Sequence, residues 1–398
     1  TQDLGVKVKS KPAEISAWLR KRSTATSIIF VTYQSGDTLA KASRKAKVKF
    51  DLGIFDEAHK TVGAEGKLFS HLLLDKNIKV DKRLFMTATE RRYQGSSDDI
   101  LSMDDPDVYG ETFELLSFKE ALDCKPPILS DYQIVTMVVT TDEVKKLIRS
   151  NVLVKPKMGR WNKETEAKML AAALQLRKAM EAHPLKHCIS FHSSIARAEA
   201  FQLTQQNITK KFPEYGQLET FHVTGAMPTS ARQKKLDEAV ASKRSLITNA
   251  RCLTEGVDVK QIDGVLFADP KGSAVDIVQA VGRALRPSKG KKRGYVVVPV
   301  VLDAKKLEKR IEQNEAYQDI LMVLRALASN DERIVEYFSS VSQGKRPRGS
   351  KRKYDFVVPA GLDIDPADFA KQVELKVWGK LAKLSWMPFE EAREFVHK

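Results

Sequence analysis

The sequence predicts an α/β protein built from doubly wound parallel sheets. Short apolar runs recur along the 398-residue chain, and amphipathic stretches separate them. Several runs are apolar throughout, which is typical of strands that are covered on both faces of a parallel sheet. Strands that alternate with helices favour this architecture over a sandwich or a helical bundle. The chain is too long for one ordinary domain, so we expect two or three domains.

The expected strands fall into two sets along the chain. The first set comprises 27–32, 50–55 and 83–86, and the second comprises 187–191, 218–223, 245–248, 264–268 and 295–301. The clearest helical stretches are 163–181, 195–204 and 230–241. A first domain at 1–130 would end in the KPPILS turn, and a second domain would span 131–305.

Three further segments are expected after the second domain. Residues 306–341 have the pattern of a helical extension. Residues 342–355 predict a basic linker, because SQGKRPRGSKRK holds neither an acidic residue nor an apolar run. Residues 356–398 have the pattern of a small helical region that begins but is not completed.

The charge of the chain favours polyanionic partners. The formal net charge is +16 and the sequence pI is about 9.5, which points to nucleic acid first. The three cysteines are far apart and include no CxxC pair, which argues against a zinc ribbon or a disulfide framework and suits a cytoplasmic location. No apolar stretch reaches about 18 residues, so we expect no membrane span.

The tetrapeptide Asp56-Glu57-Ala58-His59 follows an apolar strand directly. Carboxylates at the carboxyl end of a parallel strand lie where such sheets bind ligands. In a nucleoside triphosphatase, Asp56 would hold the Mg²⁺ that bridges the phosphates, and Glu57 would polarise the attacking water. Thr87-Ala88-Thr89 follows another strand of the same half.

The second half supplies an independent pattern, QAVGRALRP, on an expected helix. Gln279, Arg283 and Arg286 share one helical face at positions i, i+4 and i+7. Two arginines on one face suit a triphosphate, and an arginine from a facing domain can stabilise a transferring phosphoryl group. Upstream, TNARCLTEGVD follows a strand; Gly256 allows a tight turn there, and Asp258 can accept a hydrogen bond from a ribose hydroxyl.

Five ordered segments resemble motifs II to VI of superfamily 2 helicases: DEAH, TAT, the strand with FHSS at 191–194, TNARCLTEGVD and QAVGRALR. The resemblance covers about residues 27–300 and implies two RecA-like domains, the first of them incomplete, with ATP and Mg²⁺ held between them. TAT, QAVGRALR and the TYQS segment at 32–35 look more like DNA helicases related to restriction-enzyme motors than like RNA-type DEAH-box proteins. The tail is similar to helicase-associated repeats.

The resemblance implies a role for each matching residue. Asp56, His59, Gly256, Asp258, Gln279, Arg283 and Arg286 would form the ATP site, with Asp56 and Glu57 at the metal and Arg283 and Arg286 as the fingers. His59, Thr87 and Thr89 would couple that site to nucleic acid. Thr32, Tyr33, Gln34, Ser35, Thr224, Gly225 and Thr248 would contact the strand, DNA more readily than RNA.

A phosphate-binding loop is missing from this pattern. None of the four Gly-Lys pairs, at 66–67, 290–291, 344–345 and 379–380, is followed by Ser or Thr. We therefore expect a chain truncated within its first domain, with little or no ATP hydrolysis of its own. Two alternatives stay open: an ATP-independent nucleic-acid-binding module, or the motor subunit of a restriction or repair complex with partner subunits.

Overall fold

The computed structural model divides the chain into two compact units, Thr1–Leu115 and Leu116–Lys398, and each is described by itself. It describes residues 8–21, 25–64, 69–87, 90–91, 100–155, 163–250, 253, 259–268, 274–302, 315–343, 354–357, 374–375 and 377–378. The division lies before the KPPILS turn at which the sequence places it.

The segment between Leu115 and the KPPILS turn packs on the second unit. It contains α4 (Phe118–Asp123), which begins with a capping box between Ser117 and Glu120. The amide of Phe118 donates to the carbonyl of Asn330, and its ring packs edge-on against Tyr132. These contacts explain why the first unit ends earlier than the turn suggests.

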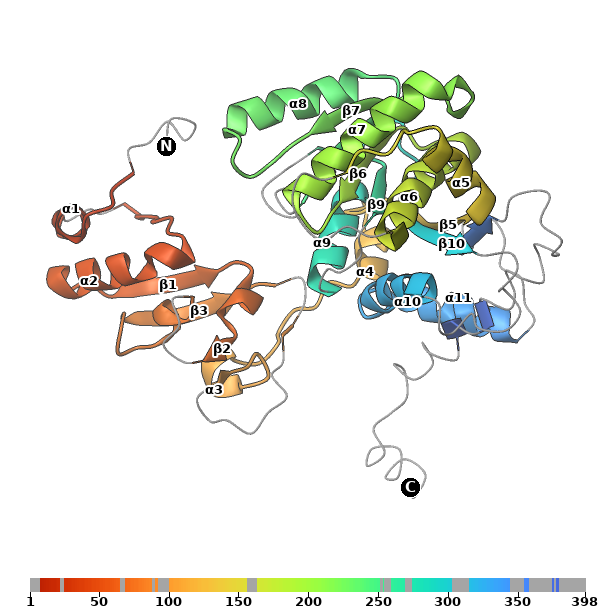
Figure 1. Ribbon diagram of the computed structural model, residues 1–398. Helices are drawn as coiled ribbons and strands as arrows, with labels where there is room; N and C mark the ends of the chain where they lie inside the picture. Colours follow the sequence, from red (N-terminus) through yellow and green to blue (C-terminus); the bar gives the residue numbers. More distant parts are fainter. Residues whose placement is uncertain are drawn as a thin grey trace, which may run out of the picture. The chain divides into compact units, whose positions relative to one another are not determined.

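The first unit is built around two parallel strands, β1 (Phe50–Phe55) and β3 (Val80–Phe85) (Figure 1). A second, antiparallel pair joins β2 (Gly63–Ala64) to β4 (Ile100–Leu101). The helical elements of this unit are α1 (Pro12–Leu19), η1 (Tyr33–Ser35), α2 (Gly36–Ala46), η2 (Ala58–Thr61), η3 (His71–Leu73) and α3 (Pro106–Tyr109). Its small core gathers aliphatic and aromatic side chains from α2, β1, η3 and α3.

The expectation of a strand at 27–32 is wrong. This stretch is extended but pairs with no strand in the described part of the first unit. Two of its apolar side chains are largely exposed, Phe30 at 94% and Ile28 at 71%, whereas Ile29 packs against the small core. Leu52 and Ile54, on one face of β1, are exposed as well. An apolar run therefore identifies a strand only where a neighbouring strand completes its hydrogen bonds.

In the described part of the second unit, seven strands form a wholly parallel sheet in the order β11-β5-β10-β9-β6-β8-β7. Its strands are β5 (Tyr132–Thr140), β6 (His187–Phe191), β7 (Glu219–His222), β8 (Ser245–Asn249), β9 (Gly264–Phe267), β10 (Gly294–Leu302) and β11 (Tyr354–Val357). Every residue of β6, β8 and β9 is buried, as their apolar sequences predict.

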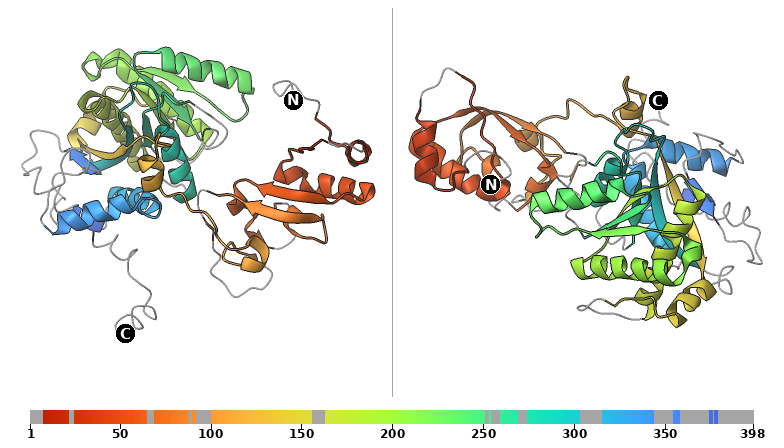
Figure 2. Two further views of the ribbon diagram at one scale, coloured as in Figure 1. Left: turned by 180° about the vertical axis from the view of Figure 1, so that it is seen from behind. Right: turned by 90° about the horizontal axis from the view of Figure 1, so that it is seen from above.

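Helices cover both faces of this sheet (Figures 1 and 2). One core joins the sheet to α5 (Thr141–Arg149), α6 (Lys163–Ala182) and α7 (Ile195–Lys211). The other joins it to α8 (Thr229–Ala241), α9 (Ala274–Ala284), α10 (Glu315–Ala328) and α11 (Glu332–Ser342). A short turn, η4 (Pro213–Tyr215), follows α7. Two-sided coverage is the doubly wound arrangement that the sequence predicts. Among the described helices, none could span a membrane.

Two strands, β5 and β11, contain polar residues. A search for continuous apolar runs in the sequence therefore does not find them. The hydroxyl groups of Thr136 in β5 and Tyr354 in β11 lie 3.0 Å apart and are both buried. Gln133 in β5 accepts a hydrogen bond from Arg293. β11 lies across the expected boundary between the linker at 342–355 and the helical region at 356–398. Most of those two segments lies outside the described residues.

The described part of the expected helical extension contains two helices, α10 and α11, and a buried polar network fixes the break between them. Asp331 caps α11 and receives hydrogen bonds from the Tyr132 hydroxyl at 2.7 Å and from Arg333. Arg333 also pairs with Asp131. Burial alone would raise the pKa of Asp331, but the bonds from Arg333 and Tyr132 lower it. The network attaches α11 to the amino end of β5.

Replacing Asp331→Ala should lower the free energy of unfolding of the second unit by about 3 kcal/mol, because Tyr132 and Arg333 lose a buried partner. Ser194→Ala, which removes only the exposed cap of α7, should cost about 1 kcal/mol. Urea unfolding followed by circular dichroism measures both. Because the pKa of Asp331 is lowered on folding, its contribution should be present at neutral pH and vanish as the pH falls below about 4. Equal losses in the two variants would contradict this account.

Candidate nucleotide and nucleic-acid site

Asp56 and Glu57 lie where β1 ends, in the position that the sequence predicts. The β1–β3 pairing continues past the strands, since the amide of Met86 donates to Phe55 and that of Ala58 donates to Met86, each at 2.9 Å. Glu57 has a left-handed backbone, with φ 53° and ψ 44°. Such a conformation is uncommon for a residue with a side chain and requires support from the surrounding structure.

The arrangement of Asp56 fits a magnesium ligand. Its side chain is exposed, and one carboxylate oxygen accepts the amide of Glu57 at 2.9 Å. Mg²⁺ is usually held by one or two carboxylates together with phosphate oxygens and water. Across the described residues, no group of three His, Cys, Asp or Glu side chains forms a metal site. Asp56 and Glu57 would therefore hold the ion only together with the phosphates.

His59 joins the ends of the two parallel strands. Its Nδ1 lies 3.0 Å from the hydroxyl of Thr87, which follows β3, and 3.5 Å from a carboxylate oxygen of Glu57. The imidazole is buried beneath the loop. The structure thus brings together three of the residues that the sequence singles out. Thr89, the other expected coupling residue, lies outside the described residues.

The TYQS segment adjoins the acidic loop through Tyr33. The Tyr33 hydroxyl donates to the backbone carbonyl of Asp56 at 2.7 Å, and its ring stacks on Phe55. Burial, together with the charge of Asp56, raises the pKa of Tyr33 to about 12, so the hydroxyl remains a donor at neutral pH. The side chains of Thr32, Gln34 and Ser35 are exposed. Of these four expected contacts to nucleic acid, Tyr33 is the residue whose hydroxyl group is already hydrogen-bonded within the protein.

In the second unit, the expected contact residues lie in or directly after two adjacent parallel strands, β7 and β8. Thr224 and Gly225 form the turn after β7, where Gly225 is exposed and Thr224 is half-buried. Thr248 lies within β8 and is fully buried, with its hydroxyl 2.9 Å from Nδ1 of His222. We therefore withdraw Thr248 as a side-chain contact: the neighbouring strand covers it, and its hydroxyl is already bonded.

The expected arginine face is only partly helical. α9 carries Gln279 and Arg283, but it ends at Ala284, so Arg286 lies in the following turn. Pro287 explains this end, because a proline disfavours helical backbone in the residue before it. Apart from its own helix, no described atom of the unit would lie within 4 Å of a Cβ atom at Gly282. Close packing against another backbone therefore does not require glycine at this position. The expected ligands Gly256 and Asp258 lie outside the described residues.

Sequence reasoning missed Asn249, which holds the loop after β8 in place. Its amide donates to the carbonyl of Ser190 in β6 at 3.0 Å, and its side-chain oxygen accepts the amide of Leu253. The side chain is fully buried. An asparagine that ends an apolar strand was the available signal, because a buried amide needs several partners.

Comparison with known proteins defines the class. Residues 167–288 match the model described as the helicase conserved C-terminal domain. This range includes FHSS, TNARCLTEGVD and QAVGRALR. The part of the second unit at 167–288 is thus similar to helicase C-terminal domains.

Relatives of the whole chain are distant. It is 26% identical over 357 residues to "Probable helicase A859L" of African swine fever virus (isolate Tick/Malawi/Lil 20-1/1983), a match that covers 86% of this chain and 35% of that protein. The chain therefore spans about a third of the length of the curated relatives it matches.

Solved structures support the same assignment. One is titled "ATP-dependent Type ISP restriction-modification enzyme LlaBIII bound to DNA", with a TM-score of 0.70 and 27% identity, covering 88% of this chain and 24% of that one. The enzyme LlaGI, solved with a DNA substrate mimic, has a TM-score of 0.54 and 22% identity, covering 92% and 23%. The predicted α/β class and RecA-like helicase fold are confirmed, as is the distant similarity to restriction-enzyme motors.

Replacing Tyr33→Phe should lower the free energy of unfolding of the first unit by about 1 kcal/mol, because it removes one hydrogen bond and keeps the ring. Ser35→Ala, an exposed change in the same turn, should alter it by less than about 0.5 kcal/mol. Chemical unfolding measures both. No difference between the variants would show that the bond from Tyr33 to Asp56 adds nothing to the stability of the loop.

Proposed function

We propose that this chain is part of an ATP-driven motor that moves along nucleic acid, DNA in preference to RNA. The observation that carries the proposal is the linkage around Asp56 and Glu57. Tyr33 joins Asp56 to an exposed turn at 2.7 Å, and His59 joins the same loop to Thr87 at 3.0 Å. A change in the acidic loop would therefore reach both neighbouring segments.

Each residue has a proposed role in that cycle. Asp56 holds Mg²⁺, and Glu57 orients the attacking water. Arg283 and Arg286 stabilise charge on the transferring phosphate, and Gln279, Gly256 and Asp258 line the nucleotide site. Thr32, Gln34, Ser35, Thr224 and Gly225 contact the strand backbone. Bound ATP and Mg²⁺ supply the phosphoryl group and the cation that neutralises its charge.

Preference for DNA rests on the relatives and on charge. The similar ATP-dependent restriction-modification enzyme LlaBIII is solved bound to DNA. The net charge of +16 favours any polyanion. Partner subunits of a restriction or repair complex are proposed on the same similarity.

The 398-residue chain alone should hydrolyse ATP no faster than a blank, because no Gly-Lys pair in it is followed by Ser or Thr. A phosphate-release assay with saturating single-stranded DNA measures this. In a longer natural protein that joins these residues to a phosphate-binding loop, Glu57→Gln should lower turnover by at least about a hundredfold and leave DNA binding intact. DNA-stimulated turnover by the short chain, or full activity of the Glu57→Gln protein, would contradict the proposal.

The chain should bind single-stranded DNA more tightly than RNA of the same sequence, and both affinities should fall steeply as salt rises. Fluorescence anisotropy with matched oligonucleotides, from low to physiological salt, measures the two affinities. Tighter binding of RNA would overturn the substrate preference without touching the motor assignment.

A further inference from the structure

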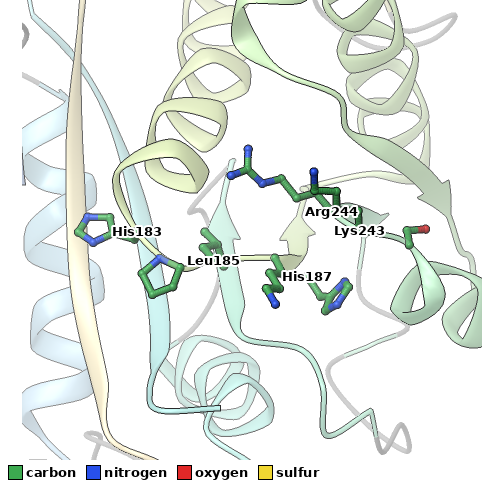
Figure 3. Close-up of a pocket in the computed structure, with 8 residues that line it drawn as sticks. His183, Leu185, His187, Lys243 and Arg244 are labelled. Atoms are coloured by element: carbon green, nitrogen blue, oxygen red, sulfur yellow. The ribbon is translucent and has the colours of Figure 1, made fainter. Parts of the chain in front are cut away.

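A pocket of about 350 Å³ opens in the second unit, where α6 ends and β6 and β8 begin (Figure 3). It is lined by His183, Pro184, Leu185, Lys186, His187, Ser242, Lys243 and Arg244. Because all strands of this sheet are parallel, their amino ends lie on the edge opposite to Thr224 and Asn249. Within the second unit, the pocket is therefore separate from the proposed strand contacts Thr224 and Gly225.

The pocket is basic and lacks an opposing acid in its lining. Lys186, Lys243 and Arg244 carry its positive charge, and none of the eight lining residues is acidic. Among the described acidic side chains, none forms an ion pair with these three cations. Arg244 is half-buried, and Figure 3 shows its guanidinium extending toward the side of Leu185 and His183. Its Nη1 lies 3.7 Å from the position that a Cβ atom at Gly216 would occupy.

One buried acid, Asp263, lies behind the lining, and backbone amides engage it. Its carboxylate accepts the amide of His187 at 2.8 Å and that of Lys186 at 3.1 Å. These bonds direct the carboxylate onto the backbone of the loop. The side-chain cations of the pocket consequently face solvent without a neutralising partner from Asp263.

His187 supplies a fixed polar group rather than charge. Its Nδ1 lies 3.0 Å from the hydroxyl of Ser245 in the neighbouring strand, so the ring is held by β8. Burial, followed by the charge of Lys186, lowers the pKa of His187, which keeps the ring neutral at physiological pH. A neutral, oriented imidazole beside three cations is suited to a ligand with several acceptor oxygens.

We propose that this pocket binds a phosphate group, held by Arg244, Lys243 and Lys186. A guanidinium and two ammonium groups provide bidentate and point contacts to phosphate oxygens. The group can belong to a free polyphosphate anion or to the backbone of a nucleic acid. The inference does not depend on the proposed motor function, since it uses none of the motif residues.

The test is a titration of the 398-residue chain, labelled at its seven histidines, with inorganic pyrophosphate, followed by NMR and calorimetry. Pyrophosphate should shift the imidazole signals of His183 and His187 most. Lys243→Gln combined with Arg244→Gln should weaken binding by at least about tenfold, because two charge-assisted contacts are lost. Arg232→Gln combined with Lys234→Gln on α8 is the control, since it removes one half-buried arginine and one exposed lysine elsewhere on the unit.

Equal weakening in both double variants, or binding without shifts at His183 and His187, would overturn the proposal and indicate attraction to the overall charge of the chain. Absence of binding would overturn it as well. A second titration with a single-stranded oligonucleotide identifies the source of the phosphate. Competition with pyrophosphate for the same shifts assigns the pocket to nucleic-acid backbone, and shifts with pyrophosphate alone assign it to a free anion. Thermal unfolding of the variants verifies that each remains folded.

Discussion

Parallel strand pairing is the constraint on which both halves of the protein depend. When neighbouring strands run in the same direction, their carboxyl ends meet at one edge, and each return connection must cross a face of the sheet. In the first unit this brings the loop after β1 beside Thr87. In the second, it places the turns after β7, β8 and β6 next to one another. Segments far apart in sequence thereby become neighbours.

Buried polar side chains then give these loops defined positions. Tyr33 and His59 anchor the acidic loop of the first unit, and Asn249 anchors the loop after β8 in the second. Each works because an unpaired polar group inside the protein is costly, so the conformation that satisfies it is favoured. The same principle locks α11 through Asp331. The loops at the carboxyl edge of each sheet are therefore held in place by hydrogen bonds from side chains that lie behind them.

Most strands of the larger sheet could be predicted, because two-sided burial leaves a continuous apolar run, as in β6 and β8. β5 and β11 could not, since they contain polar residues whose partners lie more than a hundred positions away along the chain, as Thr136 and Tyr354 do. The candidate site residues were chosen by their order along the chain, and they stay predictions. The sequence does not show that the side chain of Thr248 is enclosed by the neighbouring strand, or that the Tyr33 hydroxyl is bonded to the carbonyl of Asp56. Neither fact can be predicted from the spacing of residues along the sequence.

The bare apolar side chains of the first unit have a consequence for the protein in solution. Phe30, Ile28, Leu52 and Ile54 keep water in contact with hydrocarbon that a folded domain normally hides. The extended segment at 27–32, which pairs with no described strand, offers backbone groups that another chain can bond. Self-association should therefore grow with concentration and with sulfate, and it should weaken on cooling. The exposed apolar side chains of the first unit thus oppose the repulsion that the net charge of +16 provides between copies of the chain.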